Sequence, residues 1–495
     1  MNRRDLLRLF AAGMLLPPAA RALAASASPD AGKLLSVDAL ATGKKLKTLP
    51  KLENRAKQAG LFRATLTARA RKIELLRGKS TTFLTYNGQF PGPQIVATEG
   101  DTVEIDFRNQ LDQPTSIHWH GLPVPPLQDG NPSEAVEPGA RRLYRFTLPE
   151  GCAGTYWYHT QTHGLLAMQM YKGLLGSFIV RAKDDPLGAL PEQHWLFSDV
   201  RLRKNGAIAD NTARDWMDGR EGQFVLINGQ YRPRIRVTGT QRIRIWNACN
   251  ARCLQLALPG CRFIVVGTDG GLLPAPAAPV ERLLVAPGER YEVILQTDSP
   301  LNATLLGLPF DRHKLLDAPA ADPQPLAQVD ARPGKPIELP PVLRTIEEPG
   351  TGLRQELAFT AMLDARTARS EDDRASGQPE DFPELLAMFR INGKSYDMRR
   401  ADLRAPVDKP LDWTLHNKSR TDIVFHLHGA QFIVAQRTLG NHTERPPLAW
   451  KDTLHLQAYE TARIRFVQRE KGIRLFQCQI LEHAALGMMG QLEVV

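Results

Sequence analysis

A layout of turns and strand ends recurs three times along this chain of 495 residues. An Asn-Gly turn stands at Tyr86-Asn87-Gly88, at Ile227-Asn228-Gly229 and at Ile391-Asn392-Gly393. The intervals between these turns are about 140 and 165 residues, which is the size of a domain rather than of a solenoid repeat. The recurrence therefore predicts three copies of one β-unit.

Other parts of the unit also repeat. The alternating run Gly100 to Phe107 ends at Asn109, and Trp246-Asn247 and His416-Asn417 repeat that strand end. A later turn recurs at Glu137-Pro138-Gly139 and Ala286-Pro287-Gly288-Glu289. Short strands with frequent turns are typical of Greek-key sandwiches and barrels, so we expect an all-β protein.

The recurrence divides the chain into six predicted segments. A stretch rich in Pro, Ala and Asp follows the second unit and is interpreted as a linker. The segments are an export signal at 1–25, a linker at 26–60, units at 61–185 and 186–310, a linker at 311–355, and a third unit at 356–495.

The N-terminus has the pattern of an export signal. Asn2-Arg3-Arg4-Asp5-Leu6-Leu7 is a twin-arginine pattern, the apolar run Leu9 to Leu16 follows it, and Ala22-Leu23-Ala24 is a candidate cleavage site. We expect export to the periplasm by the twin-arginine machinery. The alternative is an ordinary amphipathic N-terminal helix.

Five cysteines are compatible with an oxidising compartment, where disulfides form. An odd number leaves at least one thiol unpaired, and Cys478 is the expected free one. Pairing among Cys249, Cys253 and Cys261 stays open.

The formal charge is +10, and the basic residues are scattered along the sequence. We interpret them as a solvated surface and expect no nucleic-acid partner. No apolar run approaches the ~20 residues of a membrane span, so none is predicted.

Two histidine pairs carry the strongest chemical signal. They are His118-Trp119-His120-Gly121 and His426-Leu427-His428-Gly429. Side chains at i and i+2 of a strand share a face, so each pair can reach one metal cluster. His159 follows the aromatic run Tyr156-Trp157-Tyr158 and is a further candidate ligand. The alternative is that these histidines are structural.

Cys478, His483 and Met488 follow one another at intervals of five residues. A thiolate, an imidazole and a thioether are the soft ligands of a blue-copper electron-transfer site. The alternative is a buried cysteine with a gap-filling methionine.

On these motifs the chain resembles three-domain bacterial multicopper oxidases, a family that includes laccases and copper-resistance oxidases. The resemblance extends from about residue 62 to the C-terminus. It implies three cupredoxin-like Greek-key domains. It also implies one-electron oxidation of a phenolic or metal-ion substrate at a mononuclear copper, coupled to reduction of dioxygen to water at a trinuclear cluster between domains one and three.

The resemblance assigns ligands position by position. His118 and His426 match the type 2 copper ligands, and His120, His159 and His428 match three type 3 ligands. Cys478, His483 and Met488 match the type 1 site, with Cys478 and His483 carrying electrons. Asp129 matches an acid linked with proton supply. Four ligand histidines of the family are replaced, by Gln161, Ile423, Gln477 and Gln479.

These replacements lead us to expect copper binding with reduced or lost turnover. Isoleucine offers no lone pair, and amides bind copper more weakly than imidazole. The type 2 position is the best preserved. Three functions remain open: an oxidase using copper, dioxygen and a small reducing substrate; a copper-binding protein without turnover; and a copper-free scaffold like the cell-division member of the family.

Overall fold

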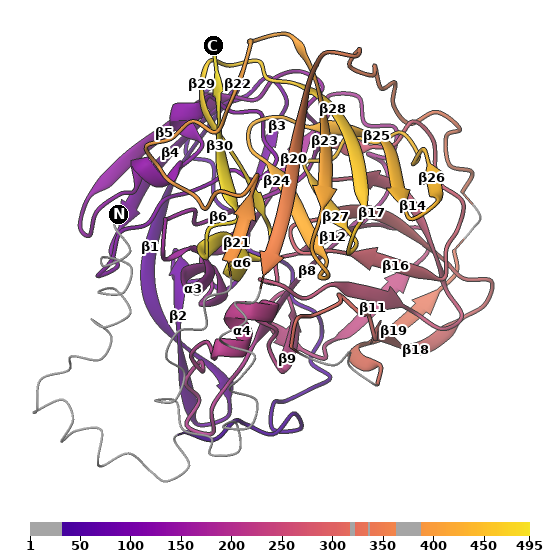
Figure 1. Cartoon of the computed structure of the whole chain (residues 1–495). Coiled ribbons are helices and arrows are strands. Elements are labelled where there is room, and N and C mark those ends of the chain that lie inside the picture. The colour runs from indigo at the N-terminus through magenta and orange to yellow at the C-terminus, as the bar shows by residue number, and fades with distance from the viewer. Residues whose placement is uncertain (1–31, 317–321, 335–336, 363–387) are drawn as a thin grey trace, which may run out of the picture.

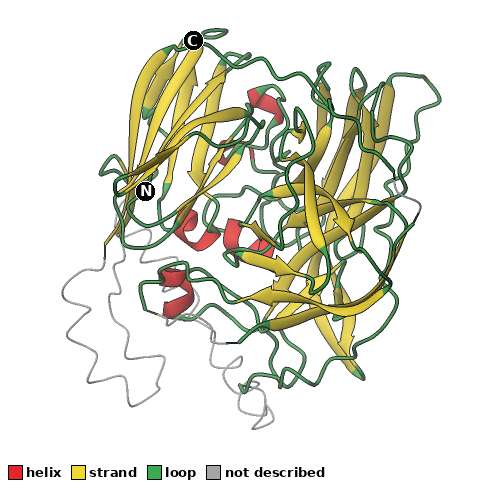
Figure 2. Ribbon diagram, turned by 90° about the vertical axis from the view of Figure 1, so that its right-hand side faces the viewer, coloured by secondary structure: helices red, strands yellow, loops and turns green. Residues whose placement is uncertain are grey.

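The computed structural model describes residues 32–316, 322–334, 337–362 and 388–495. Strands form nearly all of its regular structure, which confirms the predicted all-β class (Figures 1 and 2). The predicted export signal lies outside the described residues. Within the described ranges no helix is long and apolar enough to cross a bilayer.

The described strands form six sheets, which fall into three sequential pairs. The first sheet pair encloses an apolar core to which Val103, Ile105 and Phe107 contribute alternate residues of one strand. Its sheets have the strand orders β2-β1-β4-β5 and β3-β7-β6. The strands are β1 (Leu61–Leu76), β2 (Lys79–Tyr86), β3 (Gly92–Thr98), β4 (Thr102–Asn109), β5 (Arg141–Thr147), β6 (Gly154–His159) and β7 (Leu175–Arg181).

The second sheet pair encloses a separate core that includes Ile243, Ile245 and Phe263. Its sheets have the orders β10-β9-β8-β12-β17-β14-β15 and β11-β19-β18-β13-β16. The strands are β8 (Glu192–Val200), β9 (Phe224–Ile227), β10 (Gln230–Tyr231), β11 (Arg234–Thr238), β12 (Arg242–Asn247), β13 (Leu254–Ala257), β14 (Arg262–Thr268), β15 (Gly271–Leu272), β16 (Arg282–Val285), β17 (Arg290–Gln296), β18 (Leu301–Leu308) and β19 (Gln324–Arg332).

The third sheet pair packs around Trp413, whose ring meets Phe466 and Phe476 edge-on. Its sheets have the orders β21-β20-β23-β28-β25-β26 and β22-β30-β29-β24-β27. The strands are β20 (Leu353–Met362), β21 (Met388–Ile391), β22 (Leu403–Ala405), β23 (Pro410–Asn417), β24 (Ile423–Leu427), β25 (Phe432–Leu439), β26 (His442–Glu444), β27 (Thr453–Leu456), β28 (Thr461–Val467), β29 (Gly472–Cys478) and β30 (Met489–Val494).

Helices are few and short, and they lie in the connections between strands (Figure 2). The described ones are the α-helices α3 (Leu166–Tyr171), α4 (Ala213–Asp218) and α6 (Leu481–Ala485), and the 3₁₀ turns η1 (Pro126–Gln128) and η2 (Pro132–Glu134).

The three Asn-Gly turns have the same conformation. Asn87, Asn228 and Asn392 have φ of 53°, 52° and 50°, in the left-handed region that asparagine tolerates better than most residues. Each Oδ1 accepts a backbone N–H of an earlier strand, and each Nδ2 donates to the carbonyl two residues before that N–H. The repeated turn therefore fastens each unit's opening strands together.

The turn found at Gly139 and Gly288 also occurs in the third unit, where its sequence is different. Gly139 and Gly288 adopt positive φ, and the backbone N–H of each bonds to the carbonyl of Asn109 or Asn247. In the third unit the corresponding residue is Tyr459, which has φ of 62° and is 66% exposed. A tyrosine in place of glycine explains why the pattern shows only two copies.

The ranges predicted as linkers contain ordered structure. Strand β19 lies within 311–355 and pairs with β18 and β11, so this stretch completes a sheet of the second pair. Residues 34–52 run along the first two sheet pairs through bridges to Arg203, Arg234 and Gln94. Leu40 and Leu49 are buried on this path.

The turn geometry predicts a cost for replacing Asn228. Its amide donates to the carbonyls of Lys47 and His194, and its Oδ1 accepts from Leu196 at 2.9 Å. Asn228→Ala removes these bonds and places alanine at positive φ, so the free energy of unfolding should fall by about 3 kcal/mol. Asn228→Gly keeps the conformation and should lose less. Equal losses in denaturant unfolding would contradict a role for the left-handed turn.

Candidate metal centre

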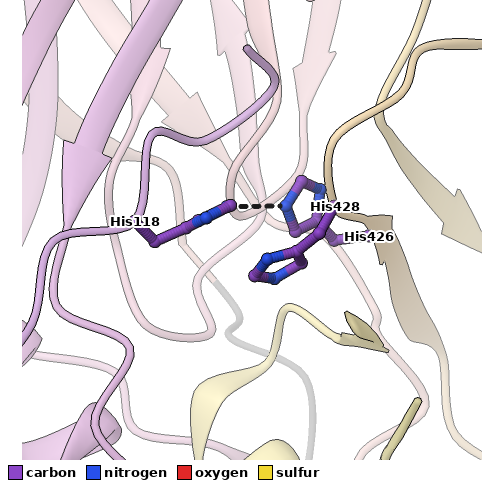
Figure 3. Close-up of side chains that lie close together, drawn as sticks. All are labelled: His118, His426 and His428. Carbon is purple, nitrogen blue, oxygen red and sulfur yellow. Dashed lines mark hydrogen bonds between the residues drawn. The ribbon is translucent and has the colours of Figure 1, made fainter. Parts of the chain in front are cut away.

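The two His-x-His pairs meet at the boundary between the first and third sheet pairs. Figure 3 shows His118 of the first pair facing His426 and His428 of the second. His118 is fixed beside His159 by two backbone hydrogen bonds, of 2.8 and 3.1 Å, between the loop after β4 and the end of β6. His426 lies in β24, and His428 follows that strand. All five imidazoles are buried. Residues some 300 positions apart in the sequence therefore share one buried cluster.

His118 and His426 point their Nε2 atoms at each other across 3.2 Å. Their other nitrogens are already committed. His118 Nδ1 donates to Asp129 Oδ1 at 2.8 Å, and His426 Nδ1 donates to the carbonyl of Asp452 at 2.9 Å. In neutral rings both facing Nε2 atoms then carry lone pairs. Only an added proton or a cation between them makes this contact favourable.

His120 and His159 repeat this arrangement. Nδ1 of His120 lies 3.2 Å from Nε2 of His159. The outer nitrogen of His120 faces Thr453 Oγ1 at 2.9 Å and Asp452 Oδ1 at 3.2 Å, while His159 Nδ1 donates to the Thr160 carbonyl at 2.7 Å. Burial lowers the pKa of His120 and His159 well below the usual value, so both rings are neutral near pH 7.

His428 is the least satisfied ring of the cluster. Its Nδ1 lies 3.5 Å from Asp129 Oδ2, its Nε2 makes no hydrogen bond with any described residue, and the ring stacks on His118 at 3.7 Å. Its ligand atom lies within 4.8 Å of those of His118 and His426. A buried imidazole with a free Nε2 beside two facing lone pairs is suited to serve as a third metal ligand.

Asp452 braces both ends of the cluster. Its carboxylate faces His120, its carbonyl accepts from His426, and it forms a fully buried ion pair with Arg290 of β17. Burial opposes ionisation of Asp452, but Arg290 outweighs it and the pKa is lowered. Asp269, in the turn after β14, accepts the backbone N–H of Asp452 at 3.3 Å. The second sheet pair thus holds the cluster in place through Arg290 and Asp269, whereas the imidazoles themselves come from the first and third sheet pairs.

The glycines of the two His-x-His-Gly motifs make room for buried charges. A Cβ on Gly121, which has φ of +86°, would lie 2.2 Å from Asp452 Oδ2. A Cβ on Gly429, with φ of +69°, would lie 2.3 Å from Nη1 of Arg474. Arg474 Nη1 is itself 3.6 Å from Asp129 Oδ2. Both glycines are therefore required by close approach as well as by conformation.

Three glutamines line the same cluster and bond to one another. Gln161 Nε2 donates to Gln477 Oε1 at 2.6 Å, and Gln477 Nε2 donates to Gln479 Oε1 at 3.2 Å. The ends of this chain, Gln161 Oε1 and Gln479 Nε2, have no partner among the described residues. We call these three residues the glutamine chain. It joins β29 to the loop after β6.

The three predicted type 1 ligands lie between two neighbouring strands: Cys478 ends β29, His483 lies in α6, and Met488 precedes β30. Backbone bonds join Cys478 to Met488 at 2.9 Å and Met488 to His483 at 3.0 Å. His483 donates Nε2–H to the Met217 carbonyl, so its buried Nδ1 keeps a free lone pair. Burial raises the pKa of the Cys478 thiol to about 11. Ile423 is completely buried in the same apolar core as Cys478 and Met488.

The comparisons with known proteins decide the family. Three family models described as multicopper oxidase match residues 67–185, 194–303 and 366–495. The chain belongs to the multicopper oxidase family. A solved multicopper oxidase from Campylobacter jejuni, titled a metallo-oxidase, is 40% identical over 94% of this chain and 98% of its own, with a TM-score of 0.88.

Some relatives of this chain are named multicopper oxidases, and others are named cell division proteins. The multicopper oxidase mco of Staphylococcus aureus is 28% identical over 91% of this chain and 93% of its own. The cell division protein FtsP of Sodalis glossinidius is 30% identical over 95% of this chain and 96% of its own. The similarity to solved multicopper oxidases confirms the predicted cupredoxin-like fold. Family membership implies copper. It leaves open whether this chain functions like the relatives named as oxidases or like those named as cell division proteins.

The residues fit copper unequally at the three kinds of family site. Two imidazole nitrogens 3.2 Å apart can both lie about 2.0 Å from one ion, so His118 and His426 suit the type 2 position. The glutamine chain stands at three positions that the sequence resemblance assigns to type 3 copper, and its amides hydrogen-bond to one another. Ile423, at the position that the resemblance assigns to type 1 copper, supplies no donor atom.

Sequence reasoning missed the residues that hold the cluster in place. Asp452, Thr453, Arg290 and Arg474 contact it or its acid, Asp129, but stand in no motif that signals a metal. The glycine after each His-x-His pair was the one sequence signal that other side chains approach the backbone closely there. The cysteines are all unpaired in the structure, so none of the pairings left open among Cys249, Cys253 and Cys261 is formed.

Buried neutral imidazoles make the metal-free protein sensitive to acid. Burial lowers the pKa of His428 to about 4 and that of His483 to about 3. Between pH 6.5 and 5 the unfolded chain gains protons on these rings and the folded chain does not. The free energy of unfolding should therefore decrease as the pH is lowered, by ~1.4 kcal/mol per pH unit for each such histidine.

This dependence can be measured by denaturant unfolding in the presence of a chelator. His428→Gln should reduce the slope by about one proton. The exposed His442→Gln is the matched control and should keep the wild-type slope. A slope unchanged by His428→Gln would show that this imidazole is not buried in neutral form.

Proposed function

We propose that this protein is an exported copper-binding member of the multicopper oxidase family with impaired turnover. The ancestral reaction is one-electron oxidation of a phenolic or metal-ion substrate coupled to reduction of dioxygen to water. The observation that carries the proposal is the pair of lone pairs that His118 and His426 direct at each other across 3.2 Å. Their outer nitrogens are bonded to oxygen acceptors, which is how proteins orient histidine ligands.

The type 2 position accordingly holds the proposed primary copper. The proposed metal residues are His118 and His426, with His428 close enough to join them. His120 and His159 form a second pair that can hold another ion. Asp129, through its bond to His118, orients a ligand, and it keeps the family's proposed place in proton supply.

Loss of electron transfer is proposed at the type 1 position and its link to the cluster. Cys478, His483 and Met488 without a second imidazole favour Cu(I) over Cu(II), because thiolate and thioether are soft ligands. In the family, histidines flank the cysteine and lead to the cluster. Here Gln477 and Gln479 flank it, and amides are weaker copper ligands than imidazoles.

A second candidate function is a copper-free scaffold resembling the cell-division relatives. The glutamine chain supports it, because amides that bond to one another keep a buried boundary satisfied without metal. The similarity to FtsP over 95% of the chain is in keeping with this candidate. The two candidates differ in the number of copper ions bound.

Export by the twin-arginine machinery to the periplasm is part of both proposals. It rests on Arg3 and Arg4 with the apolar run that follows them. That pathway carries folded proteins, which suits a chain that acquires a metal before export.

Copper analysis tests the first proposal. Protein loaded with Cu(II) and dialysed should retain about one to two ions per chain, without the intense blue absorption of a complete type 1 site. His118→Ala with His426→Ala should abolish tight binding, whereas His163→Ala, outside the cluster, should leave it unchanged. No bound copper in the wild type would favour the scaffold. Four ions with blue colour would contradict the proposed impairment.

Restoring the replaced ligands tests the cause of the impairment. A variant with Gln161→His, Ile423→His, Gln477→His and Gln479→His should bind about four copper ions and turn blue, because each family site regains its imidazoles. It should also take up dioxygen with a phenolic or cuprous substrate. Ile423→His alone should restore colour without oxygen uptake. A quadruple variant that folds but stays colourless would show that the scaffold has diverged beyond its ligands.

A further inference from the structure

A basic hairpin extends from the first sheet pair. Strand β1 pairs with β4 only from Leu61 to Ala68, and beyond that point it pairs with β2 alone. Figure 1 shows this part of the hairpin reaching away from the C-terminal strands. Arg71, Lys72 and Arg77 in it are exposed, and their side chains make no hydrogen bond or ion pair with any described residue.

Two other segments bring more positive charge to the hairpin. Lys79 Nζ donates to the carbonyl of Lys204 at 2.5 Å, and the backbone N–H of Lys204 donates to the carbonyl of Lys33 at 2.8 Å. Apolar side chains fix this arrangement, because Ile73, Leu75 and Leu76 of the hairpin pack with Leu35 against the second sheet pair. We call the surface the basic hairpin face. Its basic residues are Lys33, Arg69, Arg71, Lys72, Arg77, Lys79, Arg203 and Lys204.

Two acids among the described residues lie at the basic hairpin face, and Lys33 and Lys204 also have interaction partners. Glu74 accepts the backbone N–H of Gly78, and Asp210 pairs with Arg203 at 3.1 Å. The basic residues looked scattered along the sequence, and the fold gathers a group of them.

Exposed apolar side chains border the same face. Leu34 is 51% exposed and Val37 is 46% exposed, and Leu34 forms a β-bridge with Arg203. Nucleic acids attract basic residues but give no reason to expose leucine and valine beside them. A bilayer interface accommodates both kinds of side chain.

We propose that the basic hairpin face docks on the surface of an anionic phospholipid bilayer. Lysine and arginine ammonium and guanidinium groups lie near the lipid phosphates, while Leu34 and Val37 enter the interface. The segment predicted as an export signal lies immediately upstream in the sequence, so docking would hold the folded protein at the membrane that it crosses. This function is independent of the histidine cluster and extends beyond copper binding.

Vesicle flotation with the full chain tests the proposal. Vesicles of phosphatidylglycerol with phosphatidylcholine should bind the protein, and binding should weaken as salt rises. The reversal variant Arg71→Glu, Lys72→Glu, Arg77→Glu should lose at least about 30-fold in affinity, given the contribution of each basic residue at such surfaces. Leu34→Ser with Val37→Ser should give a smaller loss that salt does not change.

The matched control reverses three exposed lysines of the third sheet pair, in Lys394→Glu, Lys409→Glu and Lys471→Glu. It has the same N-terminus and net charge as the reversal variant and should bind like the wild type. Equal loss in both variants would indicate net charge rather than a defined face. Equal binding to pure phosphatidylcholine, or binding to duplex DNA but not to vesicles, would overturn the proposal.

Discussion

The structure depends on holding several buried imidazoles in contact with one another. His118 and His426 come from opposite ends of the chain, and their facing nitrogens repel unless a proton or a cation lies between them. Each ring is held in this orientation by a bond on its other side, to Asp129 or to the carbonyl of Asp452. Such a contact is unfavourable in isolation, so the surrounding fold must impose it.

All three sheet pairs share in imposing it. The first and third supply the histidines, and the second supplies Arg290 and Asp269, which hold Asp452. A buried ion pair is costly to desolvate and is retained where geometry has to be fixed. The Arg290–Asp452 pair fits that description, because Asp452 contacts both His120 and His426. The three sheet pairs therefore surround the histidine cluster, and the buried Arg290–Asp452 ion pair fixes the orientation of its rings.

The glutamine chain and Ile423 change what this frame can do. Glutamine fills the space of histidine and bonds to its neighbours, so the boundary stays packed where metal donors are missing. Isoleucine at 423 joins the apolar core instead of presenting a nitrogen. The proposed function follows from this arrangement: one pair of copper ligands is kept, and electron transfer through the Cys478 segment is impaired.

Much of this could be predicted from the sequence, and the reasons are specific. Asn87, Asn228 and Asn392 stand in turns whose conformation requires their residue type, so the repeat was visible. The spacing predicted that His118 and His120 reach one cluster, although the structure places them in a loop rather than in the strand that this prediction assumed. Tyr459 hid the third copy of a turn because its backbone conformation cannot be deduced from a tyrosine. Arg290 and Asp452 were missed because a pair separated by 162 residues leaves no local pattern. The basic hairpin face was missed for the same reason.

The most direct measurement is an anomalous difference map at the copper edge, from crystals of the protein equilibrated with Cu(II). The account predicts a peak between the Nε2 atoms of His118 and His426, and none of comparable height beside Ile423. A map without a peak between these two histidines, from crystals that diffract well, would contradict the claim that their facing lone pairs form a copper site.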